Sequence, residues 1–210
     1  MTLALALTTL CQAQSRKVIN LSSWDFSRDG KAWQQVAVPH DWAISGPFDK
    51  KWDLQMVAIE QNGETEKTEK SGRSGALPWI GEGMYKMNWT APKGYKRAVL
   101  VFDGAMSQPV VKVNGKEAGR WAYGYNAFRI DITPFIKFGK SNLIEVHLNN
   151  VEESSRWYPG GGLYRPVSVE LYGNENFSTW DTFVRTLKAD KQEAEVSARA
   201  FAAFIDQPRR

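Results

Sequence analysis

The sequence has very few of the side chains that carry thiolate, imidazole or metal chemistry. Its 210 residues include one cysteine, Cys11, and two histidines, His40 and His147. A single cysteine cannot close an intramolecular disulfide, and the two histidines stand too far apart to form a metal-ligand motif. No nucleophile elbow and no phosphate-binding glycine turn are present in the required strand-to-helix context. We therefore expect no cofactor and no bound metal.

Strong charge of either sign is also missing. Lys and Arg number 27 against 23 Asp and Glu, which leaves a net charge of +4, and the basic residues are scattered. The one dense charged stretch, GETEKTEK (63–70), alternates in sign, as a solvated loop does. These features exclude a nucleic-acid partner.

The longest apolar run stands at the N-terminus, in MTLALALTTLCQAQ. It is too short to span a bilayer, so we expect no membrane span. It has the length of a signal peptide and ends in the small-residue pattern at Ala13, which predicts cleavage of residues 1–13 and export to the periplasm or the extracellular space of a bacterium. A lipoprotein site at Cys11 is disfavoured by the bulk of Leu10, and a buried N-terminal strand is the remaining alternative.

What the sequence does contain is strand-like alternation. Apolar and polar residues alternate in FRIDIT (128–133), LIEVHLN (143–149) and VSVELY (167–172). Asn114-Gly115 stands between two extended runs and predicts a tight hairpin. Because no amphipathic helix separates these runs, residues 15–174 are predicted to form an all-β jelly-roll sandwich of antiparallel sheets.

The pattern changes after Tyr172. GNENF (173–177) is typical of a linker, and a new strand-like run begins at Trp180. Residues 177–210 are too few to bury a core alone, so we interpret them as the start of a second, incomplete domain.

Five stretches carry a resemblance to a known family. They are VPHDW (38–42), GEGMYKMNW (81–89), VFDGAMSQPVVKVNGKEAG (101–119), YGYNAFRIDITPFI (123–136) and SRWYPGGGLYRPV (155–167). In this order they resemble the N-terminal, galactose-binding-like domain of glycoside hydrolase family 2, and the β-galactosidase branch most. The resemblance implies a jelly roll, then an immunoglobulin-like domain that would begin in residues 177–210, then a (β/α)8 barrel holding two catalytic glutamates.

No catalytic residue is therefore expected in this chain, because a barrel alone takes about 250 residues. Glu152 and Glu153 are interpreted as solvated loop charges, since adjacent strand residues point to opposite faces. The predicted function is that of the N-terminal portion of a secreted β-galactosidase-like hydrolase, which packs on its own barrel and has a β-galactoside or related β-glycoside as partner. The alternatives are a stand-alone carbohydrate-binding module and an interaction scaffold.

The candidate substrate-binding residues are Ser155, Arg156, Trp157 and Tyr158. Aromatic rings can stack on the C–H face of a sugar, and Ser and Arg side chains can bond to its hydroxyls. In related enzymes a polar residue of this segment, often an aspartate, reaches the substrate, and Ser155 or Arg156 stands there here. The alternative is that Trp157 and Tyr158 only cap the end of the sandwich, where Gly160–Gly162 permit a bend.

The other motifs are interpreted as architectural. His40 lies in a corner after Pro39, with Asp41 available to fix its imidazole, and His147 lies on an outward strand face. Three tryptophans are assigned to the core: Trp33, Trp42 and Trp89. Tyr123 and Tyr125 are expected to cover a sheet edge, and Asp131 to bond the backbone at a strand end.

Overall fold

The computed structural model describes residues 16–49, 79–151, 160–177 and 182–204. The predicted signal peptide (1–13), the charged stretch 63–70 and the segment 152–159 lie outside the described residues. No helix of the described residues is long and apolar enough to cross a membrane.

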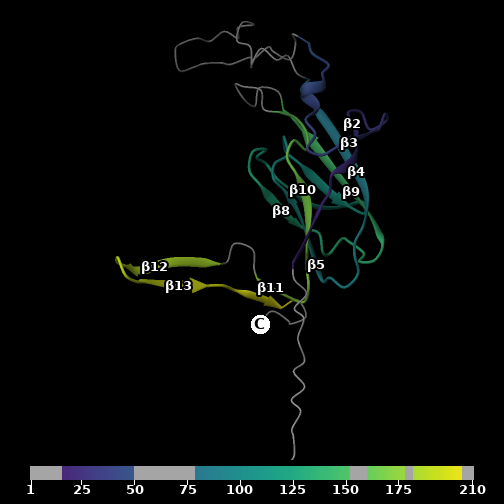
Figure 1. The fold of residues 1–210 in the computed structure, drawn as a ribbon. Coiled ribbons are helices and arrows are strands. Elements are labelled where there is room, and N and C mark those ends of the chain that lie inside the picture. Colours follow the sequence, from purple (N-terminus) through teal and green to yellow (C-terminus); the bar gives the residue numbers. More distant parts are fainter. Residues whose placement is uncertain (1–15, 50–78, 152–159, 178–181, 205–210) are drawn as a thin grey trace, which may run out of the picture.

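Two antiparallel sheets pack face to face (Figure 1). The larger has the order β3 (Gln34–Ala37), β2 (Ser23–Ser27), β4 (Glu82–Thr90), β9 (Ser141–Asn149), β6 (Val110–Val113) and β7 (Lys116–Arg120). The smaller has the order β1 (Lys17–Asn20), β10 (Val167–Tyr172), β5 (Arg97–Phe102) and β8 (Phe128–Asp131). From β4 to β10 the chain passes repeatedly from one sheet to the other, as in a jelly roll. The predicted all-β sandwich is confirmed.

The alternating stretches bury the faces that the sequence predicts. Ile144, Val146 and Leu148 of β9 are buried, and the residues between them are half-buried. On the facing sheet, Phe102 stacks on Phe128 with ring centroids 4.7 Å apart. The core therefore lies between the sheets, where each removes the apolar face of the other from water.

The Asn-Gly hairpin forms as predicted between β6 and β7. Asn114 has φ 52° and Gly115 has φ 79°, the left-handed pair that a two-residue turn requires. The Asn114 side chain donates to the carbonyl of Phe135 at 2.9 Å, which ties the hairpin to the turn before β9. That turn is itself helical, because the N–H of Ile136 donates to the carbonyl of Ile132.

The outer face of the smaller sheet carries buried polar groups. Glu170 and Tyr172 alternate outward from the core, yet their exposed fractions are 3% and 7%. Arg129 donates to the Glu170 carboxylate at 3.0 Å, and Arg16 and the Tyr172 hydroxyl also bond to it. Paired charges make this burial possible, because an ion with partners costs far less to bury than an isolated one.

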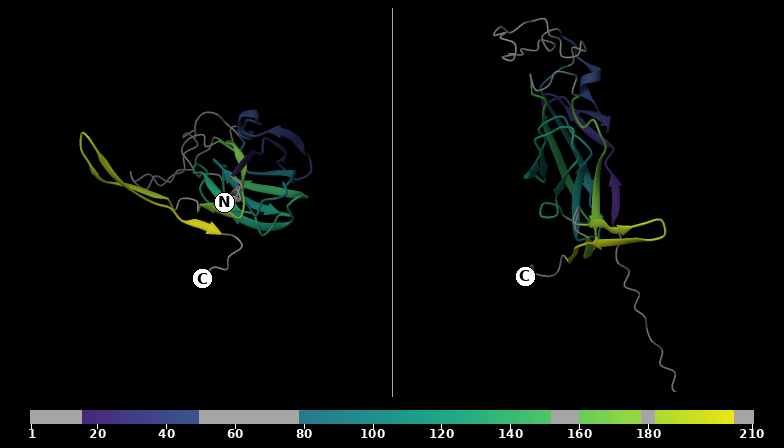
Figure 2. Two further views of the ribbon diagram at one scale, coloured as in Figure 1. Left: turned by 60° about the horizontal axis from the view of Figure 1, so that its bottom comes forward. Right: turned by 90° about the vertical axis from the view of Figure 1, so that its left-hand side faces the viewer.

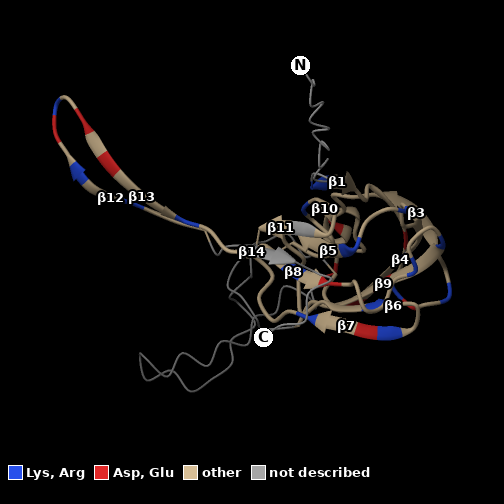
Figure 3. Ribbon diagram, turned by 90° about the horizontal axis from the view of Figure 1, so that it is seen from below, with Lys and Arg blue, Asp and Glu red and all other residues tan. Residues whose placement is uncertain are grey.

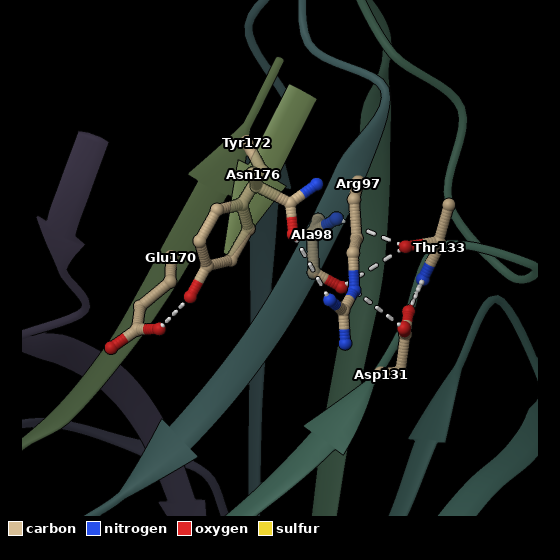
Figure 4. A network of polar contacts seen from close by, with 7 residues as sticks. All are labelled: Arg97, Ala98, Asp131, Thr133, Glu170, Tyr172 and Asn176. Carbon is tan, nitrogen blue, oxygen red and sulfur yellow. Dashed lines mark hydrogen bonds and ion pairs between the residues drawn. The ribbon is translucent and has the colours of Figure 1, made fainter. Parts of the chain in front are cut away.

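Asp131 bonds the backbone at its strand end, as predicted, and also joins a network on the same sheet (Figure 4). Its Oδ1 accepts from the N–H of Thr133 at 3.0 Å, and its Oδ2 accepts from Nε of Arg97 at 2.9 Å. Arg97 donates in turn to Oδ1 of Asn176 at 3.5 Å. Arg97 thereby links the sandwich to the strand that follows it.

That strand corrects the expected linker. Part of GNENF forms β11 (Glu175–Phe177), which pairs with β14 (Ala202–Phe204), while β12 (Phe183–Ala189) pairs with β13 (Ala194–Arg199). The β12–β13 hairpin projects away from the sandwich (Figure 2), and every residue of β12 is exposed. The immunoglobulin-like character of residues 177–210 stays a prediction.

Candidate functional site

The four predicted substrate-binding residues, Ser155 to Tyr158, lie outside the described residues, as do Glu152 and Glu153. The described chain stops at Val151 and resumes at Gly160. The site can therefore be built from the groups that hold these two ends.

The two ends are tied to each other and to the larger sheet. The side chain of Asn150 donates to the carbonyl of Gly160 at 3.1 Å, and its backbone N–H donates to the carbonyl of Gly81 at 2.9 Å. Gly162 exchanges two backbone hydrogen bonds with Met106, at 3.0 and 2.9 Å. Both ends are thus held at one end of the sandwich, beside β4.

The glycine run is required by close packing as well as by the bend that the sequence predicts. A Cβ on Gly161 would lie 2.4 Å from Nε1 of Trp42, and one on Gly162 would lie 2.3 Å from the hydroxyl of Tyr85. Neither distance is tolerable, so only glycine lets the returning chain pass over these two rings. Gly162 also has φ 103°.

Asp41 joins the glycine run to the 3-10 turn η1 (Trp42–Ser45). Its Oδ1 accepts from the backbone N–H groups of Ala43 and Gly161, both at 3.0 Å. The backbone N–H of Trp42 donates to the carbonyl of Gly161 at 3.0 Å. One carboxylate therefore caps the turn and fixes the returning chain.

His40 is a structural corner, as predicted. Its Nδ1 lies 2.7 Å from the Tyr85 hydroxyl, and its ring packs against Phe26 with centroids 4.9 Å apart. Burial lowers the pKa of His40, and the nearby Asp41 carboxylate opposes that shift. Burial raises the pKa of Tyr85 far above its usual range. Both groups are neutral at pH 7, which suits a packed corner.

The tryptophan assignments are right in two cases of three. Trp42 and Trp89 are buried, with exposed fractions of 0% and 7%. The assignment of Trp33 to the core is wrong. This residue lies in the turn between β2 and the edge strand β3, and it is only partly buried. It lines an open cleft that no local pattern of the sequence indicates. Of the predicted edge-covering pair, Tyr123 is exposed and packs on Tyr125.

The described residues hold no arrangement suited to glycoside cleavage. Retaining glycosidases use two carboxyl groups about 5–5.5 Å apart. Glu170 is the one buried carboxylate among the described residues, and its partners are cations and a tyrosine.

Charges of both signs are interspersed over β7 and the β12–β13 hairpin (Figure 3). His147 faces outward as predicted and pairs with Glu82 at 3.1 Å. No group of three or more potential metal ligands occurs in the described ranges.

Comparisons with known proteins were made for the sequence and for the fold. No protein-family model matches the chain. A β-galactosidase of Bacteroides ovatus is 33% identical over 165 residues, which are 77% of this chain and 17% of that protein. A β-glucuronidase of Bacteroides fragilis is 27% identical over 208 residues, 89% of this chain and 26% of that protein. The chain thus spans between about a sixth and a quarter of the length of these curated relatives.

Comparison with solved structures agrees with the sequence comparison. A glycosyl hydrolase family 2 member from Bacteroides cellulosilyticus superposes with a TM-score of 0.70 at 28% identity, over 88% of this chain and 24% of that one. A β-glycosidase from Bacteroides vulgatus has the same TM-score at 22% identity, over 90% of this chain and 24% of that one, and supports the fold alone. The chain therefore belongs to glycoside hydrolase family 2 and corresponds to an N-terminal β-sandwich portion of such an enzyme.

Proposed function

We propose that this chain is the N-terminal portion of an exported hydrolase that cleaves β-galactosides or related β-glycosides. The observation that carries the proposal is the 33% identity to a β-galactosidase over 77% of the chain. The relatives include both a β-galactosidase and a β-glucuronidase. Both substrate classes therefore belong in the test.

In this proposal the sandwich does not cleave the glycosidic bond itself. It packs on a catalytic barrel that supplies the two glutamates, and such a barrel requires about 250 residues. The contribution of the sandwich is a rigid scaffold and part of the rim of the sugar pocket.

Ser155 to Tyr158 are the proposed rim residues. The support is the anchoring of the flanking chain: Asn150 bonds to Gly160, and Gly161 bonds to Asp41. The two described residues that flank the segment, Val151 and Gly160, therefore belong to one end of the sandwich. The aromatic and polar side chains of the segment suit a sugar ring.

The decisive experiment begins with the coding DNA beyond Arg210, read in three frames. Where it encodes a barrel, the extended protein is expressed beside the 210-residue chain, and both are assayed on aryl β-galactoside and aryl β-glucuronide. We expect turnover of one of these substrates by the extended protein and none by the 210-residue chain. An extended protein that leaves every aryl glycoside intact would contradict the proposal.

Within the active extended protein, Trp157→Ala separates the rim role from capping alone. If Trp157 belongs to the rim, its substitution raises KM or lowers kcat/KM and leaves the unfolding temperature unchanged. If Trp157 only caps the sandwich, its substitution lowers the unfolding temperature and leaves kcat/KM per folded molecule the same.

Export is tested independently. Expressed in a Gram-negative host, the chain is expected to appear in the periplasm with Gln14 as its first residue, because cleavage follows Ala13. An intact N-terminus on a cytoplasmic product would contradict export.

A further inference from the structure

The cleft that Trp33 lines is a second place where this chain can meet a ligand. Its volume is about 870 Å³, and it lies between the turn that joins β2 to β3 and the end of η1. Among the residues that line it are Arg28, Asp29 and Trp33. The volume is within the range of small-molecule sites.

The indole of Trp33 is held in place although it is partly exposed. Its Nε1 donates to the carbonyl of Gly30 at 3.1 Å, and the ammonium of Lys86 lies 3.7 Å from the ring centroid. These two contacts fix the ring before any ligand arrives. A fixed, partly exposed indole is the kind of surface on which a flat ligand stacks at little entropic cost.

Arg28 supplies hydrogen-bond donors to the same cleft. Its Nη2 donates to the carbonyls of Trp42 and Gly46, and its guanidinium lies 4.9 Å from the ring centroid of Trp79. None of the described residues forms an ion pair with Arg28, and burial lowers its pKa. A guanidinium has five N–H donors, so two carbonyl contacts leave capacity for a ligand.

Asp29 supplies the complementary acceptor. Its Oδ1 accepts from the Ser27 hydroxyl at 3.0 Å and from the backbone N–H groups of Lys31 and Ala32 at 2.8 and 3.0 Å. The backbone bonds, that from Lys31 first, lower the pKa of Asp29, so it is ionised at pH 7. Its Oδ2 has no hydrogen-bond partner among the described residues.

We propose that this cleft is a saccharide-binding subsite, in which Trp33 stacks on an uncharged sugar ring while Arg28 donates to its hydroxyls and Asp29 accepts from them. The argument for a neutral sugar is the Asp29 carboxylate, which accepts from hydroxyls and repels an acidic ring, while the ammonium of Lys86 is already held against the Trp33 ring. The inference rests on the proposed function for the class of ligand. It adds a site at the β2–β3 turn, lined by residues other than the proposed rim residues.

The test uses the 210-residue chain and calorimetric titration with β-1,4-galactotetraose, with cellotetraose and tetragalacturonate in parallel. We expect saturable binding of at least one neutral tetrasaccharide and binding at least roughly tenfold weaker for tetragalacturonate, which corresponds to one decade in Kd. Absence of binding by both neutral sugars overturns the proposal, as does preferential binding of the acidic one.

Variants then locate the binding. Trp33→Ala is expected to weaken it roughly tenfold, the order of loss for one aromatic stack. Asp29→Asn keeps an oxygen to accept the turn bonds and removes the second carboxylate oxygen, so binding falls. A small fall in the unfolding temperature accompanies it, because the turn bonds favour the ionised carboxylate. The matched control is Trp121→Ala, an exposed tryptophan outside the cleft that stacks on Phe128. Equal losses of saccharide affinity in Trp121→Ala and Trp33→Ala would contradict binding in the cleft.

The failure of this inference and that of the proposed function give different results. Binding that is lost with Trp157→Ala and retained with Trp33→Ala overturns the cleft and leaves the rim proposal intact. An extended protein that cleaves a β-glycoside while neither neutral tetrasaccharide binds the 210-residue chain likewise overturns the cleft alone. Binding at the cleft together with an inactive extended protein overturns the hydrolase proposal and retains a carbohydrate-binding module.

Discussion

The β9 strand of the sandwich and the β12 strand of the projecting hairpin both carry large apolar side chains, but these side chains differ in burial. Ile144, Val146 and Leu148 of β9 are buried between two sheets. Phe183, Val184 and Leu187 of β12 have exposed fractions of 60%, 60% and 48%. Strand propensity is therefore enough to form a ladder in both regions, whereas burial requires a second layer. A two-stranded hairpin without one is marginal in water.

The largest effect that this comparison predicts is in the sandwich core. Phe102→Ala removes a fully buried ring that stacks on Phe128, and we expect a loss of about 3–5 kcal/mol in the free energy of unfolding. Urea unfolding followed by tryptophan fluorescence measures it. A loss as small as that of an exposed-site change would mean that the two sheets do not form the common core described here.

A smaller loss is expected where the glycine run crosses the rings. Gly161→Ala places a methyl group 2.4 Å from Nε1 of Trp42, and overpacking of this kind costs about 1–3 kcal/mol. Gly115→Ala is the matched control, because its methyl group meets nothing within 4 Å and only its φ of 79° is unfavourable. Thermal unfolding of both variants separates steric contact from backbone strain. Equal losses would show that the contact with Trp42 is relieved by a shift of the chain.

A pH effect of the sandwich follows from His40. Burial lowers its folded-state pKa below the unfolded value, so the unfolded chain binds the proton more tightly. Stability from this group is present above the unfolded pKa of about 6.5 and is lost as the pH falls through the lower folded pKa. Urea unfolding between pH 8 and pH 5 should show a decline in the free energy of unfolding that His40→Gln reduces. An unchanged decline in His40→Gln would assign the effect to other groups.

The smallest effect belongs to the hairpin. Val196 of β13 is 55% exposed, so Val196→Ala is expected to change the main unfolding transition by less than about 0.5 kcal/mol. The same urea experiment used for Phe102→Ala measures it. A loss of several kcal/mol would indicate that the hairpin packs against the sandwich in solution and that the contrast between the two regions is wrong.

The fold was predictable because its signals are local. Alternation in Phe128–Thr133 and Leu143–Asn149 determines which face is apolar, and Asn114-Gly115 determines a turn through φ alone. Trp33 was misassigned because composition does not tell a core tryptophan from one beside an edge strand. Glu170 was missed because its burial depends on Arg16 and Arg129, which are far away in the sequence.

The sequence by itself determined the all-β class, the hairpin, the apolar faces and the family, since each depends on residue order and short-range backbone preference. Only the tertiary structure decided that Gly161 and Gly162 must pass over Trp42 and Tyr85, and that Asp41 holds the returning chain. It also placed Arg28, Asp29 and Trp33 around one cleft. The physical reason is that close contact and shared burial arise between segments that folding brings together, and no local pattern encodes such a distance.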